Sequence, residues 1–374
     1  MARVLFVVRA LGGGGAERQL CILAAALRRR GHHVAIATFY PGGPYADALL
    51  AGTGVELISL EKRRTSETVR FFWRAARVVR AQRPDVIHGY LELGNVVATV
   101  LRAAAPRARV AWGLRNADLD VSRDGLLARL VWQASRAASW GADTLIANSA
   151  AAAEYHMRSG YPRRRMHVIH NGIDTALFAP DRCGRAHVRA ELGIPPAASV
   201  IGLVGRFDPR KGHDVFIAAA RRFAAHRPQA RFLCVGDGEE PHRSLVARWL
   251  DESGLDGRLV RTGFRRDMPA VYSACDIVTC ASYTESFPNV LAEAMASGVP
   301  CVTTAVGEAP LIVGETGEVV PPRDAAAMAC AWERLLARSD DALAAACRAR
   351  IVERFSVEQL VARTAGVLQL EAAR

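Results

Sequence analysis

The sequence predicts an α/β protein made of two Rossmann-like, doubly wound domains. Short apolar runs alternate with longer stretches of helical periodicity from the first residue onward, which is typical of parallel strands joined by crossover helices. The alternation pauses once, and a chain of 374 residues is long enough for two domains with separate cores. We therefore expect two parallel sheets, each covered by helices on both faces.

Strands are expected where short apolar runs lie between turn-forming residues. In the first domain these runs are 4–8, 34–38, 56–60, 86–88, 110–112, 144–148 and 166–169. In the second domain they are 200–204, 231–235, 259–262, 277–280, 300–303 and 318–320. Turn formers and charges fill residues 170–187, so we expect domains at 1–178 and 179–355. Residues 356–374 open at capping-box spacing and predict a terminal helix that packs back onto the first domain.

Composition and charge argue against several classes of protein. The net charge of +12 is carried almost entirely by arginine and is dispersed, which favours a solvated basic surface over a nucleic-acid-binding face. The eight cysteines form no C-x-x-C pair, so we expect a reducing cytoplasm. The N-terminal apolar run is broken at Arg9 and Gly12, too early for a signal peptide, and no segment offers the roughly 18 apolar residues of a membrane span.

The stretch 285–298, ESFPNVLAEAMASG, predicts a short helix with an anion site at its start. Pro288 is expected in the first turn, where its missing N–H costs nothing, and Gly298 ends the helix in a left-handed conformation. Glu285 precedes this anion site and Glu293 follows it, which suits a ligand with a charged middle and hydroxyl-rich ends, such as a nucleotide sugar. The backbone N–H groups without a helical partner belong to Asn289, Val290 and Leu291.

A glycine-rich loop follows the first strand of the first domain. Residues 11–18, LGGGGAER, lie between a strand and a helix, so the backbone at Gly13, Gly14 and Gly15 can approach a ligand. A merely tight turn would also explain this run. A dinucleotide fingerprint fits poorly, because its third glycine would fall at Arg18.

The second domain repeats this arrangement in residues 205–212, GRFDPRKG. Beyond Gly205, the side chains of Arg206 and Lys211 lie five residues apart in one loop and can contact a diphosphate from two sides. Lys211 is one of only two lysines in the chain, which favours a specific role over a solvated surface charge. Gly263 and Phe264 fall at a later strand end, where they could line a nucleoside pocket or simply form a turn.

Taken together and in order, these motifs resemble glycosyltransferase family 4, whose members are retaining enzymes of the GT-B fold. The resemblance rests on NSA at 148–150, HNGID at 170–174, GRFDPRKGHD at 205–214, the glycine loop at 236–238, ESFPNVLAEAMASGVP at 285–300 and TGEVVPPRD at 316–324. It implies an acceptor-binding first domain and a donor-binding second domain that face a cleft. The most specific part is the E-x7-E pair formed by Glu285 and Glu293.

The resemblance also implies roles for single residues. Glu285 would bind hydroxyls of the donor sugar and Glu293 would bind the ribose, in keeping with carboxylates as acceptors. Arg206 and Lys211 would bind the diphosphate, and the amides that follow Phe287 would approach the sugar and phosphates. Because these cations and a helix N-terminus stabilise the leaving group, neither a metal nor a cofactor is expected. The expected donor is a UDP- or GDP-sugar.

One part of the family pattern is missing. Members usually carry a histidine shortly after the fourth strand of the first domain, facing the donor sugar. Here His88 falls one step before that position, so Tyr90 or Glu92 would take the place of the histidine, or His88 is an ordinary core residue. Asn116, after the fifth strand, is a further candidate for the cleft.

The acceptor is predicted only as a saccharide or a lipid-linked saccharide. Arg70, Arg74, Arg77 and Arg80 recur at helical spacing beside the apolar segment 71–73, which would suit an anionic membrane surface. Ordinary amphipathic packing explains the same pattern. The leading hypothesis is therefore a retaining hexosyltransferase of glycan synthesis, cytoplasmic or peripheral at the inner membrane face. The alternatives are another GT-B enzyme, such as a nucleotide-sugar epimerase or a phosphorylase, and an arginine-rich nucleic-acid binder.

Overall fold

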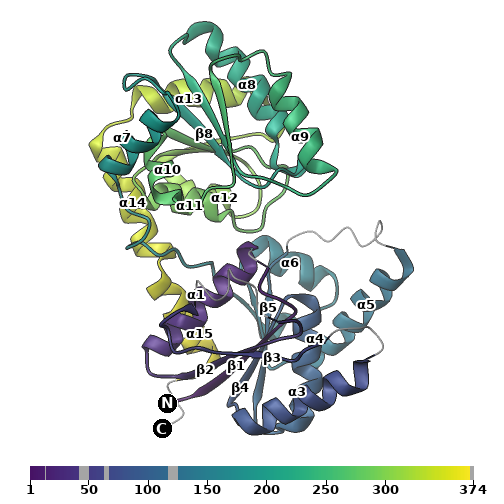
Figure 1. Ribbon diagram of the computed structural model, residues 1–374. Helices are drawn as coiled ribbons and strands as arrows, with labels where there is room; N and C mark the ends of the chain where they lie inside the picture. The colour runs from purple at the N-terminus through teal and green to yellow at the C-terminus, as the bar shows by residue number, and fades with distance from the viewer. Residues whose placement is uncertain (13, 42–49, 63–66, 117–124, 371–374) are drawn as a thin grey trace. The chain divides into compact units, whose positions relative to one another are not determined.

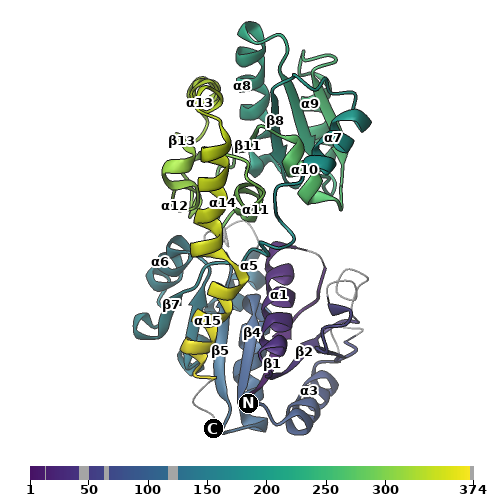
Figure 2. The ribbon, with the colours of Figure 1, turned by 90° about the vertical axis from the view of Figure 1, so that its left-hand side faces the viewer.

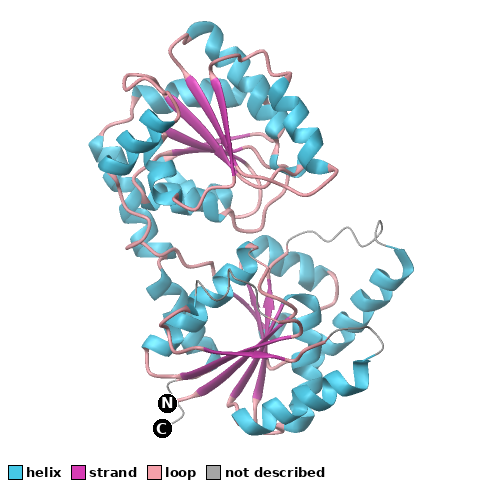
Figure 3. Cartoon of the chain, in the orientation of Figure 1, coloured by secondary structure: helices cyan, strands magenta, loops and turns pink. Residues whose placement is uncertain are grey.

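The fold consists of two α/β units, described here from a computed structural model (Figure 1). The structure describes residues 1–12, 14–41, 50–62, 67–116 and 125–370. Unit 1 contains Met1–Gly172 and Val357–Arg374, and unit 2 contains Ile173–Ser356. In each unit a parallel sheet lies between two layers of helices (Figure 3), which confirms the predicted fold class.

The sheet of unit 1 has the strand order β3-β2-β1-β4-β5-β6-β7, with every described pairing parallel. The order reverses between β1 and β4, and in such sheets ligands bind at the carboxyl ends of the strands beside this reversal. The strands are β1 (Arg3–Val8), β2 (His33–Thr38), β3 (Glu56–Ser59), β4 (Val86–Tyr90), β5 (Arg109–Leu114), β6 (Thr144–Ala147) and β7 (Met166–Val168).

Helices cover both faces of this sheet and form a separate core on each. One face packs against α1 (Gly15–Arg29) and the terminal helix α15 (Val357–Leu368), which both lie toward the viewer in Figure 2. The terminal helix joins unit 1, because its apolar side completes the core around α1. The other helices of the unit are α3 (Thr68–Gln82), α4 (Leu91–Leu101), α5 (Gly125–Ala138) and α6 (Ala150–Arg158).

Unit 2 repeats the same design. Its strand order is β10-β9-β8-β11-β12-β13, again parallel, with the reversal between β8 and β11. The strands are β8 (Val200–Val204), β9 (Arg231–Val235), β10 (Leu259–Gly263), β11 (Ile277–Cys280), β12 (Cys301–Thr304) and β13 (Glu318–Val320).

The helices of unit 2 also divide between the two faces of the sheet. One core gathers α8 (His213–His226), α9 (His242–Asp251) and α13 (Ala325–Ala337) around the buried Trp332. The opposite core contains α10 (Met268–Ala274), α11 (Asn289–Ala296), α12 (Ala309–Val313) and α14 (Asp341–Phe355). Helix α7 (Arg182–Glu191) packs beside α10. Side-chain caps start several helices, because an oxygen there accepts a first-turn N–H: Ser149, Asp181, Asp324 and Asp340.

The predicted strands agree with the observed ones, and the differences lie at their ends. The fifth strand was expected over 110–112 but continues to Leu114. Gly113 and Leu114 have little strand propensity as a pair, yet both align with neighbouring strands, Gly113 opposite Tyr90 and Leu114 opposite Ala147. Pairing with neighbours therefore extends β5 by two residues and places Arg115 directly at its end.

A buried histidine makes unit 1 sensitive to acid. The ring of His156 packs among Trp132, Tyr155 and Tyr161, with its centroid 4.8 Å from that of Tyr161. Burial lowers the pKa of His156 to about 4, from an ordinary value of 6.5. The unfolded chain therefore binds one more proton than the folded chain between these two values, and stability falls as the pH decreases through that window.

We predict that His156→Phe makes unfolding less dependent on pH. The parent should lose stability between pH 6.5 and pH 4 with a contribution from His156 of up to about 1.4 kcal/mol per pH unit, which the phenylalanine variant lacks. Urea unfolding at several pH values measures the slope. His226→Gln, at the exposed end of α8, is the control and should keep the parent's slope. An unchanged slope in His156→Phe would contradict this assignment.

Candidate functional site

Four loops meet at the carboxyl edge of the sheet in unit 2. The loop after β8 reaches the loop after β9, where Phe207 N donates to Asp237 O at 2.8 Å. The loop after β9 also contacts the end of β10, where Gly236 N donates to Gly263 O at 2.9 Å. On the other side Tyr283 N, after β11, donates to Arg210 O at 2.8 Å. Backbone hydrogen bonds thus join the predicted ligand-binding loops into one surface.

Two glycines permit this close approach. Gly212 has a φ of +69°, and a Cβ there would lie 2.0 Å from Ala281 O. Gly236 has a φ of +145°, and a Cβ there would lie 1.9 Å from Gly205 O. Any larger residue would have to push these backbones apart, so the contact between the loops after β8, β9 and β11 depends on glycine.

Lys211 and Glu285 form an ion pair at the centre of this surface. Lys211 Nζ lies 2.5 Å from Glu285 Oε1, and Ser282 Oγ donates to the same oxygen at 2.8 Å. Burial has the largest single effect on the pKa of Lys211 and lowers it, but the charges of Glu285 and Cys280 and the hydrogen bond to Glu285 together outweigh burial, so the net shift is upward. The lysine is therefore a fixed positive charge at neutral pH. A cavity of about 10 Å³, comparable to one water molecule, adjoins the pair.

The two acceptor oxygens of Glu285 differ in their surroundings. Oε1 is held by Lys211 and Ser282, whereas no hydrogen bond to Oε2 is found among the described residues. The side chain is 12% exposed, so it keeps limited access to solvent. Glu285 can therefore present one oxygen to a ligand hydroxyl while the other fixes its orientation.

The remaining cations of the loop have different environments. Arg210 is neutralised by Asp208, with Nη2 2.7 Å from Oδ2, and this bond lowers the pKa of the Asp208 carboxyl to about 2. Arg206 is 65% exposed and lies 3.9 Å from Asp208 at its nearest. Arg210 and Lys211 are thus each paired with a carboxylate, whereas Arg206 makes only a long contact with Asp208. That Arg206 and Lys211 bind a diphosphate stays a prediction.

Helix α11 differs from its prediction in two details. Pro288 is the N-cap instead of a first-turn residue, and the helix begins at Asn289. The proline has an extended ψ of 95°, so the chain turns into the helix only after it. The amides of Asn289, Val290 and Leu291 form the first turn, although Leu291 N already bonds to Pro288 O at 3.2 Å. Phe287 is buried and packs on Phe355 with ring centroids 5.7 Å apart.

Glu293 is buried, so it is no exposed helix carboxylate. Only 4% of its surface is accessible, and Tyr272 OH donates to its Oε2 at 2.8 Å. A buried carboxylate costs free energy unless hydrogen bonds satisfy it, which gives the tyrosine of α10 a positioning role.

Gly263 and Phe264 lie at the same edge of the sheet. Phe264 is 67% exposed, an unusual position for a large aromatic side chain and one that leaves its ring free to stack on a ligand.

In unit 1 the glycine loop also precedes a helix. Gly13 lies outside the described residues, Gly14 is the N-cap of α1, and Gly15 is the first residue of that helix. The Glu17 carboxylate folds back over the start of the helix, since a Cβ on Gly14 would lie 2.3 Å from Glu17 Oε2. The start of α1 therefore already has a negative side chain beside it.

The residues considered for the role of the missing family histidine lie partly in the core and partly at the edge of the sheet. His88 is completely buried inside β4 between the rings of Phe6 and Tyr90, each with its centroid 5.2 Å away, which is a core position. Tyr90 is 1% exposed, and its hydroxyl accepts a hydrogen bond from Arg115. Glu92 and Asn116 are half-buried and face each other, with Asn116 Nδ2 3.0 Å from Glu92 Oε1.

Sequence reasoning missed several residues of these sites. Ser282 and Tyr272 position the two glutamates, and no local pattern distinguishes them from ordinary residues. Tyr283 OH donates to Asp214 Oδ2 at 2.6 Å beside the same loop. In unit 1 the missed residue is Arg115, whose signal was available as an arginine at the end of an apolar strand.

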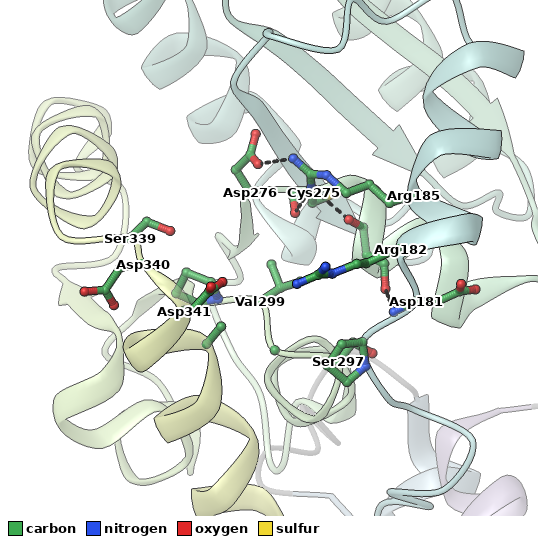
Figure 4. A pocket seen from close by; sticks show the side chains of 15 residues that line it. Asp181, Arg182, Arg185, Cys275, Asp276, Ser297, Val299, Ser339, Asp340 and Asp341 are labelled. Carbon is green, nitrogen blue, oxygen red and sulfur yellow. Dashed lines mark hydrogen bonds and ion pairs between the residues drawn. The ribbon is translucent and has the colours of Figure 1, made fainter.

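A larger hollow of unit 2 lies at the opposite end of the sheet (Figure 4). It has a volume of about 270 Å³ and borders the residues before β11 and β12. Its charged walls are mostly engaged with one another: Arg185 pairs with Asp276 at 2.6 Å, and Asp181 and Asp340 cap helices. This pattern indicates a structural role. Among the described residues, no three His, Cys, Asp or Glu side chains cluster as a metal site would require.

Two doubly wound parallel sheets, each with candidate ligand groups at its carboxyl edge, define the GT-B class of proteins. Two family models match successive parts of the chain, "Glycosyltransferase Family 4" at residues 13–177 and "Glycosyl transferases group 1" at residues 198–338. The chain belongs to this family of glycosyltransferases.

Individual relatives agree with this assignment. A D-inositol 3-phosphate glycosyltransferase of Mycobacterium sp. (strain KMS) is 37% identical over 207 residues, or 53% of this chain and 45% of that protein. The chain thus matches about half the length of its curated relatives. Anabaena HepE in complex with UDP-glucose has a TM-score of 0.85 at 24% identity, covering 99% of this chain and all of that one. Sucrose-phosphate synthase of Thermosynechococcus elongatus has a TM-score of 0.80 at 25% identity, with both chains fully covered.

We predict that Gly212→Ala disrupts the surface formed by the loops after β8, β9 and β11. The added methyl group meets Ala281 O and requires a left-handed φ, so the free energy of unfolding should fall by about 1–3 kcal/mol and the pair of Lys211 and Glu285 should separate. Thermal unfolding measures the first effect. Gly193→Ala is the matched control, because its φ is +63° with open space around the Cβ, and it should cost less. Equal losses in the two variants would contradict the importance of the contact with Ala281.

Proposed function

We propose that this protein transfers a hexose-type sugar from a nucleoside-diphosphate sugar to a saccharide or lipid-linked acceptor in glycan synthesis. The observation that carries the proposal is the pair of Lys211 and Glu285 at 2.5 Å, which places a fixed cation beside a carboxylate with one open oxygen. A donor of this kind has a diphosphate next to a ring of hydroxyls. The UDP-glucose complex of HepE, a similar structure, supports a UDP-sugar over a GDP-sugar.

Each group of the site has a part in this mechanism. Lys211 and Arg206 bind the diphosphate and stabilise its charge as it leaves, together with the N-terminus of α11. Glu285 orients the donor sugar through Oε2, and Glu293, positioned by Tyr272, binds the ribose. Phe264 stacks on the base. We propose retention of the anomeric configuration, with the leaving phosphate taking the acceptor's proton, and no metal ion, because these cations already supply positive charge.

We expect nucleotide-sugar binding to require both charged residues of the pair. Calorimetry with UDP-glucose should show at least a tenfold loss of affinity in Lys211→Ala and in Glu285→Gln, because a charge-assisted contact contributes about 1.5–3 kcal/mol. Arg248→Ala, at an exposed position of α9, is the control and should bind UDP-glucose as the parent does. GDP- and ADP-sugars are tested in parallel. Undiminished binding in both site variants, or no binding of any nucleotide sugar to the parent, would refute the proposed donor site.

The reaction itself has two further readouts. NMR of the product should show the anomeric configuration of the donor, and inversion would reject the retaining mechanism. Turnover should be unchanged after treatment with a chelator, and loss of activity that added Mg²⁺ or Mn²⁺ restores would reject metal independence. A transferred sugar would also exclude the epimerase and phosphorylase alternatives.

We further propose that α3 of unit 1 rests on an anionic membrane surface, which would bring a lipid-linked acceptor within reach at the cytoplasmic face. Val69 is 85% exposed and Trp73 is 61% exposed, and the Arg77 guanidinium lies 5.6 Å from the Trp73 ring. The helix therefore has an outward apolar strip beside basic residues, as interfacial helices do. The inward residues Phe71 and Val79 belong to the core, so the predicted aromatic face is partly ordinary packing. None of the described helices has the length and apolarity needed to cross a bilayer.

Sedimentation with phospholipid vesicles tests this surface. We expect binding to vesicles that contain phosphatidylglycerol, weaker binding to pure phosphatidylcholine, and a several-fold loss in Trp73→Ala. Trp140→Ala is the matched control, because that tryptophan is also 61% exposed but belongs to another part of unit 1. Equal losses in the two tryptophan variants, or no difference between the lipids, would refute binding through α3.

A further inference from the structure

Unit 1 contains a buried arginine that no described acid neutralises. Arg115 follows β5 directly and is 7% exposed. It lies at the carboxyl edge of the sheet, next to Tyr90 at the end of β4 and Asn171 beyond β7. Switch-point geometry makes this edge the natural ligand side of the unit.

The partners of this guanidinium are neutral. Nη1 donates to Asn171 Oδ1 at 3.2 Å, Nη2 donates to Tyr90 OH, and Cζ lies 4.5 Å from the centroid of the Tyr90 ring. Nε is buried and has no acceptor among the described residues. The nearby carboxylate of Glu92 bonds to the Asn116 amide instead. Within the described part of the chain, Arg115 therefore meets no opposing charge and keeps unused donors.

Another buried arginine of the same chain shows what a purely structural role looks like. Arg189 is 4% exposed, and it pairs with Asp276 at 2.9 Å. Its Nε donates to Ala274 O at 3.0 Å, and Nη1 donates to two further backbone carbonyls. Every side of that guanidinium is engaged with an acceptor, and one of these acceptors is the carboxylate of Asp276, which Arg189 shares with Arg185. The contrast indicates that Arg115 has a role in ligand binding in addition to any role in the fold.

The surroundings of Arg115 preserve its positive charge without offsetting it. His88 packs beneath Tyr90, and burial together with the charge of Arg115 lowers the pKa of His88 to about 3, so the imidazole is neutral. The tyrosine is neutral as well, since burial raises its pKa. An isolated buried cation costs several kcal/mol, and such charges are normally paired or coordinate a ligand.

We propose that Arg115 anchors an anion site of unit 1 that binds a phosphate or carboxylate group of a substrate. Guanidinium groups suit these ligands because several N–H donors share one plane and can contact two oxygens together. Tyr90 and Asn171 position the guanidinium from two sides, and an incoming anion supplies the missing charge. The inference rests on the proposed function in one respect, namely that unit 1 receives the acceptor. The anion then belongs to an acidic acceptor or, as the other source, to a uronosyl group on the donor.

The first arm of the test probes the site with inorganic phosphate. Protein labelled with ¹⁵N-arginine should show a protected Nε–H signal for Arg115, assigned by its loss in Arg115→Lys. We expect phosphate to move this signal in a saturable way, and an unmoved signal would overturn the proposal. No nucleotide takes part in this arm, so its failure is distinct from failure of the donor site.

The second arm separates the two sources of the anion. Calorimetry compares UDP-glucuronate with UDP-glucose in the parent and in Arg115→Gln, with Arg107→Gln at an exposed position as the control for net charge. A loss of at least tenfold for UDP-glucuronate alone in Arg115→Gln would assign the anion to the donor sugar. Equal affinities in the parent and Arg115→Gln, with the phosphate shift present, would assign it to the acceptor. If Arg115→Gln does not fold, Arg115→Lys replaces it, since it keeps the charge and changes the geometry of the donors.

Discussion

The bond between Lys211 and Glu285 connects the parts of unit 2 on which the candidate site depends. It joins the loop after β8 to the loop after β11 across the reversal of the strand order. The same junction relies on Gly212, which lets the first loop reach Ala281, and on Ser282, which holds the shared carboxylate oxygen. Breaking a partly buried ion pair leaves an unpaired charge in a poorly solvated position, so this contact favours one arrangement of the two loops. The candidate site is thus preorganised before any ligand arrives.

The two units share one architecture but differ in whether the cation at the carboxyl edge of the sheet is paired with a carboxylate. In unit 2 the central cation is paired, and a ligand would share it with Glu285. In unit 1 the central cation, Arg115, has neutral partners among the described residues, so a ligand would supply the first opposing charge. In open α/β sheets ligands bind at the carboxyl ends of the strands, which is where both sheets present these polar groups. The difference in charge pairing is a property of this chain's own residues.

Much of this architecture could be predicted from the sequence, because strand periodicity and turn formers act locally. The strand at 231–235 and the glycine at 298 are examples, since neighbours in the chain determine both. Contacts between distant segments were out of reach. The burial of Glu293 depends on Tyr272 of another helix, and the core position of His88 depends on Phe6 of another strand. Arg115 was not recognised as a strand-end residue, because Gly113 favoured an end of β5 at residue 112, before its actual end at Leu114.

The central claim is that Lys211 and Glu285 act as one unit in binding the donor. A double-mutant cycle with Lys211→Met, Glu285→Gln and the double variant tests it through the free energy of UDP-glucose binding measured by calorimetry. If the pair acts together, the double variant should lose less than the sum of the single losses, with a coupling of about 1–3 kcal/mol. Losses that add to within about 0.5 kcal/mol would show that the two residues bind independently and would contradict the account.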